Sequence, residues 1–265
     1  MANFWHIVNN VIRDADVLLL LLDARLVNET RNLEIEKKVK AAGKPLIYVI
    51  TKCDLVENKD FEDAHKEVLF DAPKKKLLVE YKKELKPCVF VSAIKYYGVT
   101  ILRERILIEA NKHKIKSSPI KVGVLGYPNV GKSSLINAVS GGSGAPTSMM
   151  SGYTKGLQKI KCDNRIMFLD TPGVIPFMEK ESEKHSMIGS VDFTKVKEPD
   201  LAVMKIMEQF PGKVEAYYDV PVIDDFEATL ENITISKNII KSGNQPNIDK
   251  MARTILKNWQ KGNIK

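Results

Sequence analysis

The stretch Gly126-Tyr127-Pro128-Asn129-Val130-Gly131-Lys132-Ser133 decides the fold that this sequence is expected to adopt. It fits the pattern GxxxxGK[ST], and an apolar run at Ile120–Leu125 leads into it. In a strand–loop–helix unit of this kind, backbone N–H groups at the helix N-terminus point at a phosphate, and the glycines allow its close approach. We therefore predict a phosphate-binding loop followed by a helix that begins near Gly131.

Side chains and backbone of this loop supply the first set of predicted contacts. Lys132 neutralises charge on the β- and γ-phosphates, and Ser133 offers a hydroxyl to Mg²⁺. The other loop and helix residues predicted to bind nucleotide are Asn129, Val130, Gly131 and Ser134.

A second motif, Asp170-Thr171-Pro172-Gly173, follows the apolar run Ile166–Leu169. A carboxylate at the end of a strand can hold Mg²⁺ through water, and the N–H of Gly173 can meet a γ-phosphate. Thr154 lies between the two motifs, where its hydroxyl either completes the Mg²⁺ shell or belongs to an ordinary loop. The predicted catalytic residues are Lys132, Thr154 and Gly173, and the predicted Mg²⁺ ligands are Ser133, Thr154 and Asp170.

Base recognition is predicted upstream of the phosphate loop. Thr51-Lys52-Cys53-Asp54 follows the run Leu46–Ile50, and an Asp carboxylate can accept both N1–H and N2–H₂ of guanine while a lysine stem packs on the purine. Ser92, Ala93 and Ile94 follow another run, at the place where a backbone N–H would meet guanine O6. Each motif ends a strand, which is where open α/β sheets bind ligands.

The rest of the chain fits one α/β domain and a smaller helical one. Apolar runs of strand length alternate with helical patterns up to about residue 180, which predicts an α/β P-loop fold with a mostly parallel sheet over residues 1–180. Residues 181–265 predict a small all-α domain, with Ile248, Met251, Ile255 and Trp259 on one helix face.

Composition narrows the class of protein further. The 265 residues carry a formal net charge of +8, and residues 1–121 hold 23 basic and 17 acidic side chains, an excess of +6. That excess is permissive for nucleic acid, because it sets non-specific attraction to phosphates. Three cysteines without a CxxC pair, no apolar run long enough to span a membrane and no signal peptide predict a cytoplasmic protein without a membrane partner.

The motifs together resemble those of Ras-like GTPases in permuted order, base recognition first and phosphate binding second. That order resembles the circularly permuted GTPases of the YlqF/YawG group, which act in ribosome assembly, and Asp23-Ala24-Arg25 is similar to the end of a strand in that group. The resemblance covers nearly the whole chain. It implies a Mg²⁺-dependent GTPase that binds GTP or GDP, acts as a switch in assembly of the large ribosomal subunit, and is a monomer off the ribosome. With this resemblance, we expect rRNA phosphates to meet chiefly the basic residues 1–121.

Two departures bear on catalysis. Val174 stands where Ras-like enzymes have a water-orienting glutamine, so we expect slow intrinsic hydrolysis and outside catalytic help. The resemblance implies that Asn129 helps to hold a K⁺ ion, although Asn129 could instead brace the loop. The alternative function is a GTP-gated protein-binding switch with no RNA partner.

Overall fold

The computed structural model describes residues 2–56, 83–142, 158–171 and 191–264, and the chain divides into two compact units. The described residues up to Thr171 belong to the first unit and those from Val191 onward to the second. The predicted boundary between residues 180 and 181 lies outside the described residues and stays a prediction. No helix in the described ranges is long and apolar enough to cross a membrane.

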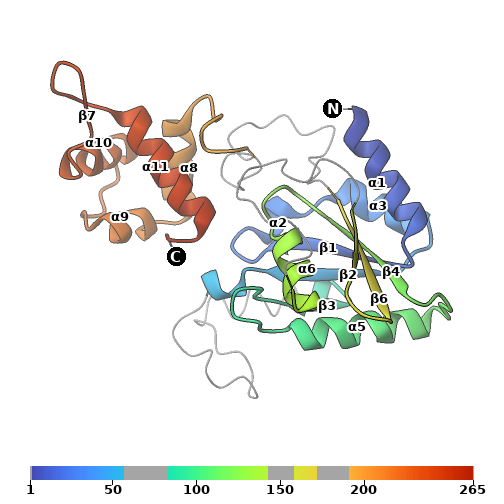
Figure 1. The fold of residues 1–265 in the computed structure, drawn as a ribbon. Coiled ribbons are helices and arrows are strands. Elements are labelled where there is room, and N and C mark those ends of the chain that lie inside the picture. The colour runs from blue at the N-terminus through green and yellow to red at the C-terminus, as the bar shows by residue number, and fades with distance from the viewer. Residues whose placement is uncertain (1, 57–82, 143–157, 172–190, 265) are drawn as a thin grey trace. The chain divides into compact units, whose positions relative to one another are not determined.

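A six-stranded sheet forms the centre of the first unit (Figure 1). Adjacent strands are parallel except at the last pair, where β5 runs antiparallel to β6. This confirms the predicted α/β class with a mostly parallel sheet. In spatial order the strands are β3 (Cys88–Phe90), β2 (Leu46–Thr51), β1 (Val17–Asp23), β4 (Ile120–Gly126), β6 (Ile166–Asp170) and β5 (Gln158–Lys161).

The edge strand β5 is absent from the sequence expectation, and its composition explains why. Its residues Gln-Lys-Ile-Lys bury only Ile160, so the strand has no apolar run to reveal it. An edge strand is paired on one side only and can keep polar side chains in water.

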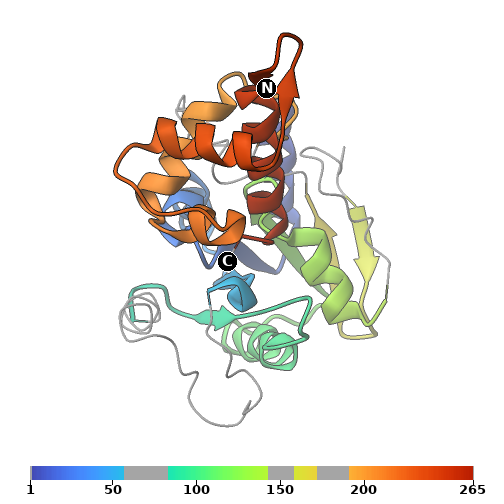
Figure 2. The ribbon, with the colours of Figure 1, turned by 90° about the vertical axis from the view of Figure 1, so that its left-hand side faces the viewer.

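Helices cover both faces of the sheet (Figure 1, Figure 2). The helices α1 (Ala2–Asp14) and α3 (Leu33–Ala41) pack against the even-numbered leucines of β1, while α5 (Val99–Lys112) and α6 (Lys132–Ser140) lie on the opposite face. Because successive side chains of a strand point to opposite faces, both sets of β1 side chains are buried. This double burial is why β1 is apolar at every position up to Asp23.

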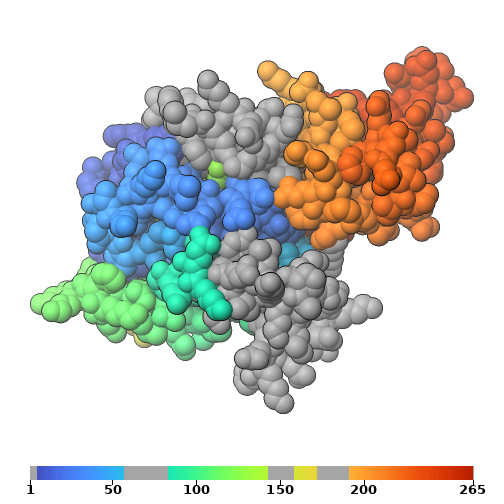
Figure 3. Space-filling view, turned by 180° about the vertical axis from the view of Figure 1, so that it is seen from behind, coloured from blue at the N-terminus to red at the C-terminus, as the bar shows by residue number. Residues whose placement is uncertain are grey.

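In the view from behind, residues of the N-terminal part of the first unit, drawn in blue, lie above residues drawn in teal and green (Figure 3). Short elements complete this unit: α2 (Val27–Thr30) after β1 and the 3₁₀ turn η1 (Cys53–Leu55) after β2. Both lie at the carboxyl ends of their strands, and they bring polar residues to that edge of the sheet.

The link between α5 and β4 is held in place by a residue at the start of β1. The Asp16 carboxylate accepts hydrogen bonds from the Ser117 hydroxyl at 2.6 Å and from the Lys121 backbone N–H at 2.8 Å. Along the sequence, β4, the strand that carries the phosphate loop, comes after β1, β2 and β3. This order is the one predicted for a permuted domain.

The second unit is helical, with one short hairpin. Its helices are α8 (Pro199–Gln209), α9 (Lys213–Tyr218), α10 (Phe226–Ser236) and α11 (Ile248–Lys261), and its hairpin pairs β7 (Ile240–Lys241) with β8 (Gln245–Pro246). The predicted stripe on α11 forms its core face, since Met251, Ile255 and Trp259 are fully buried. Strands of two residues have no periodicity that a sequence pattern could show.

Candidate nucleotide-binding site

The phosphate loop lies between β4 and α6, at the carboxyl edge of the sheet. Gly126 ends β4 with φ +147°, and a Cβ atom there would lie 2.8 Å from the Leu21 carbonyl oxygen. Gly131, with φ +98°, precedes the first residue of α6, so the turn into the helix also needs a glycine. The loop thus has the conformation in which backbone N–H groups gather at a helix N-terminus.

Lys132 folds back over this loop and is buried. Its Nζ donates to the Tyr127 carbonyl oxygen at 2.7 Å and to the Gly126 carbonyl oxygen at 3.3 Å. Burial lowers the pKa of Lys132 to about 8, and the nearby Asp170 offsets only part of this effect. The ammonium is therefore a cation held at the loop with little compensating negative charge.

Asp170 lies beside it at the end of β6. The Ser133 hydroxyl donates to Oδ2 of Asp170 at 3.0 Å, whereas Oδ1 is buried without a hydrogen-bond partner among the described residues. Burial raises the pKa of Asp170, against the opposing effect of Lys132. Hydroxyl and carboxylate oxygens are ligands that Mg²⁺ prefers. The Ser133 hydroxyl and the Asp170 carboxylate, with its unpaired Oδ1, therefore fit a divalent cation.

The predicted base-recognition residues also meet in space. Asp54, on η1, accepts a hydrogen bond from the buried Ser92 hydroxyl at 2.6 Å, although the two residues come from different strand ends. Ser92 also accepts from the Lys95 backbone N–H at 3.1 Å, which closes a turn over Ala93 and Ile94. The Ile94 side chain is 77% exposed, so only its backbone can serve the predicted contact.

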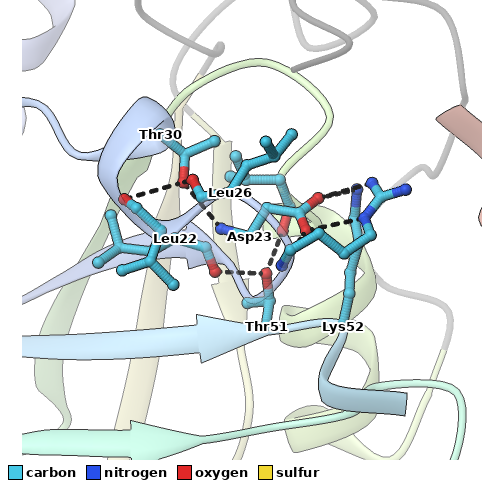
Figure 4. A network of polar contacts seen from close by, with 9 residues as sticks. Leu22, Asp23, Leu26, Thr30, Thr51 and Lys52 are labelled. Carbon is cyan, nitrogen blue, oxygen red and sulfur yellow. Dashed lines mark hydrogen bonds and ion pairs between the residues drawn. The ribbon is translucent and has the colours of Figure 1, made fainter. Parts of the chain in front are cut away.

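Thr51 joins the base-recognition strand to the phosphate loop (Figure 4). Its hydroxyl lies 2.9 Å from the Leu22 carbonyl oxygen on β1 and 2.7 Å from the Val130 carbonyl oxygen in the loop. The two predicted motifs, far apart in sequence, are thus in direct contact through one buried side chain.

Lys52 adopts a left-handed backbone conformation, φ 56°, and its Nζ lies 2.8 Å from Oδ2 of Asp23. Burial lowers the pKa of Lys52, while Asp23 opposes that shift and Arg25 adds to it. Burial alone would raise the pKa of Asp23, but the adjacent Arg25 and Lys52 cations hold it well below its usual range.

Comparisons with known proteins agree with this arrangement. The family model described as the elongation factor Tu GTP-binding domain matches residues 1–112, and the model described as a 50S ribosome-binding GTPase matches residues 121–244. A crystal structure of YlqF from T. maritima superposes with a TM-score of 0.61 over 98% of this chain and 94% of its own, at 18% identity. The fold is that of the circularly permuted GTPase YlqF, and both halves of the chain match GTPase family models.

The curated relatives that the chain matches are longer than the chain itself. An uncharacterized GTP-binding protein of Methanocaldococcus jannaschii is 36% identical over 262 residues, and GTPase grn1 of Schizosaccharomyces pombe is 30% identical over 284 residues. These matches cover 97% and 96% of this chain but 65% and 59% of the relatives.

Other predicted site residues of the GTPase differ in how far the structure places them. Asn129 lies in the loop with φ +59°, and Ser134 is exposed on the first turn of α6. Thr154, Gly173 and Val174 lie outside the described residues, so their roles stay predictions.

Two residues of the network around Lys52 are missing from the predicted site of the GTPase. Asp23 and Arg25 enter the sequence analysis only as part of a family resemblance, yet Asp23 pairs in register with Thr51 across β1 and β2. The signal that could have found them is positional: Asp23 is a charged residue that ends a fully apolar strand next to a predicted ligand strand.

Proposed function

We propose that this protein binds GTP with Mg²⁺ and hydrolyses it to GDP and phosphate. The observation that carries the proposal is the Asp54–Ser92 contact at the same sheet edge as the phosphate loop. An Asp carboxylate directed at a purine edge accepts the two adjacent N–H donors of guanine, which adenine lacks. The phosphate loop supplies contacts to the phosphates. The carboxyl edge of the sheet therefore carries groups for both the base and the phosphates of a guanine nucleotide.

Each residue of the proposed phosphate and metal site has a part in this reaction. Lys132 neutralises charge on the β- and γ-phosphates, which is the main contribution a P-loop makes to phosphoryl transfer. Ser133 and Asp170 would hold a Mg²⁺ ion, which would supply positive charge against the charge that develops on the phosphates during transfer. Thr154 and Gly173 complete the metal and γ-phosphate contacts in this proposal.

Hydrolysis is proposed to be slow without assistance. The aliphatic Val174 cannot orient water, so help comes from outside the chain or from a K⁺ ion beside Asn129. A turnover assay with Na⁺ replaced by K⁺ tests the second source, and equal rates in the two salts would exclude it.

The proposed cellular role is that of a GTP-dependent switch in assembly of the large ribosomal subunit, in the cytoplasm. It is supported by the +6 excess charge of residues 1–121 and by the match of residues 121–244 to a model described as a 50S ribosome-binding GTPase. The protein is proposed to be a monomer off the ribosome and to contact rRNA through its basic GTPase domain.

Cosedimentation with separated ribosomal subunits tests this role. We expect binding to the large subunit with a non-hydrolysable GTP analogue and release with GDP. Loss from ribosomal fractions at moderate salt, with no dependence on nucleotide, would instead favour a GTP-gated switch that binds only protein. Equal affinity for ATP and GTP would refute the nucleotide assignment itself.

A further inference from the structure

Asp23 binds two basic side chains next to the proposed nucleotide site, and no proposed step uses it. Its Oδ1 accepts hydrogen bonds from the backbone N–H and the Nε of Arg25, both at 3.0 Å. Its Oδ2 lies 2.8 Å from Nη2 of Arg25 and 2.8 Å from Nζ of Lys52. Figure 4 shows Asp23 beside Lys52 in this network.

The Asp23 and Arg25 side chains of this network are buried, and the Lys52 side chain is partly exposed. The side chains of Asp23 and Arg25 are 1% and 3% exposed, whereas that of Lys52 is 21% exposed. A buried ion pair with several hydrogen bonds holds its groups in one geometry, because separating them would leave an uncompensated charge. The ammonium of Lys52 is therefore fixed at the sheet edge, in a side chain that stays partly accessible.

The backbone on both sides of the carboxylate is fixed as well. The Asp23 N–H donates to the Thr30 hydroxyl at 3.0 Å, and that hydroxyl donates to the Leu26 carbonyl oxygen at 2.6 Å. Since Thr30 lies on α2, the helix after β1 locks the position from which Asp23 reaches Lys52.

We propose that Asp23, oriented by Arg25, is a positioning residue that fixes Lys52 so that its aliphatic stem forms the platform for the purine ring. A free lysine would have to lose its rotamer freedom when the base binds, and a lysine already held by Asp23 has lost it beforehand. The inference rests on the proposed guanine site, and it assigns to Asp23 a share of the affinity for the base and none for the phosphates.

Asp23→Asn tests it, with GDP and inorganic pyrophosphate as probes in competition with a fluorescent GDP. We expect GDP to bind about 10- to 100-fold more weakly, as for the loss of base stacking, while pyrophosphate competes within twofold of wild type. The matched control is Asp16→Asn, which removes a hydrogen-bonded carboxylate at the opposite end of β1 and should leave both values unchanged.

Coupling to Lys52 separates positioning from general stability. In a Lys52→Met background, which keeps the stem without its charge, Asp23→Asn should cost less than threefold in GDP affinity. Equal weakening of GDP and pyrophosphate, an additive double variant, or an Asp23→Asn variant no weaker than Asp16→Asn would each overturn the proposal.

Asp23→Asn leaves two cations without their carboxylate and can fail to fold. In that case Arg25→Met decides: a selective loss of GDP affinity supports the positioning role, and unchanged GDP affinity overturns it. Wild-type protein that does not prefer GDP to ADP would refute the proposed function, whereas a GDP-selective wild type with an indifferent Asp23→Asn refutes this inference alone.

Discussion

The two halves of the proposed nucleotide site differ in how far the protein compensates its own charges. In the phosphate half, formed by Gly126–Ser133 and Asp170, a buried lysine has backbone carbonyls as hydrogen-bond partners and a carboxylate oxygen has none among the described residues. In the base half, formed by Asp23, Arg25, Thr51–Asp54 and Ser92, the carboxylates are already paired. The phosphate half is thus arranged to gain charge from its ligand, and the base half is organised before the ligand arrives.

This contrast follows from the chemistry of the two ligand ends. A phosphate chain with Mg²⁺ brings its own charges, so unpaired groups in the protein become favourable contacts on binding. A guanine ring is neutral and offers hydrogen bonds and a flat face, so its affinity depends on groups that need not rearrange. Variants in the two halves should accordingly lose different ligands.

The largest expected effect is that of Lys132→Met. It removes the buried cation of the phosphate half, and we expect at least about a 100-fold loss of affinity for both GDP and pyrophosphate. Calorimetric titration measures both. Lys121→Met, at an exposed lysine near the start of β4, serves as the control and should bind as wild type does. If pyrophosphate competed equally well against Lys132→Met, the assigned phosphate contact would be wrong.

Asp54→Asn should have the next largest effect, confined to the base. The amide can still accept from Ser92 but presents N–H₂ to guanine, so we expect about a 100-fold loss of GDP affinity and a gain for xanthosine diphosphate. Competition assays with the two nucleotides and pyrophosphate give the result. Retained preference for GDP would remove Asp54 from base recognition.

Sequence reasoning named the local motifs of the proposed site but not the contacts between strands that join them. Lys132, Ser133 and Asp170 are fixed by a motif and by one strand end, which are local features. The contacts of Asp23 with Lys52 and of Thr51 with Val130 depend on which strands are neighbours and in what register, and no local pattern encodes either. The edge strand β5 escaped for a related reason, since its pairing rather than its apolar content makes it a strand.

Thr51→Val sharpens the comparison because Thr51 contacts both halves. Removing the hydroxyl leaves two buried carbonyl oxygens without that donor, so we expect about a fivefold to tenfold loss of affinity for GDP and for pyrophosphate alike. The same loss in both ligands distinguishes it from Asp54→Asn. Thr234→Val removes a comparable buried hydroxyl in the second unit and should change neither affinity. A Thr51→Val variant that lost GDP alone would place Thr51 in the base half only.

The smallest effect, a dependence on pH, comes from the phosphate half. Bound phosphates favour the protonated ammonium of Lys132, whose pKa in the free protein is lowered to about 8. Between pH 7.5 and 9 most of the free protein loses this proton, so binding must take one up, and GDP affinity should fall about eightfold. The unfolded chain keeps this proton to higher pH. The contribution of Lys132 to the stability of the free protein therefore rises between pH 7.5 and 9, whereas GDP affinity falls.

Calorimetry at pH 9 in two buffers of different ionisation enthalpy should detect net proton uptake on GDP binding. Lys132→Arg, which stays charged, should show weaker binding with a flat profile, and an unchanged slope in that variant would assign the titration to another group.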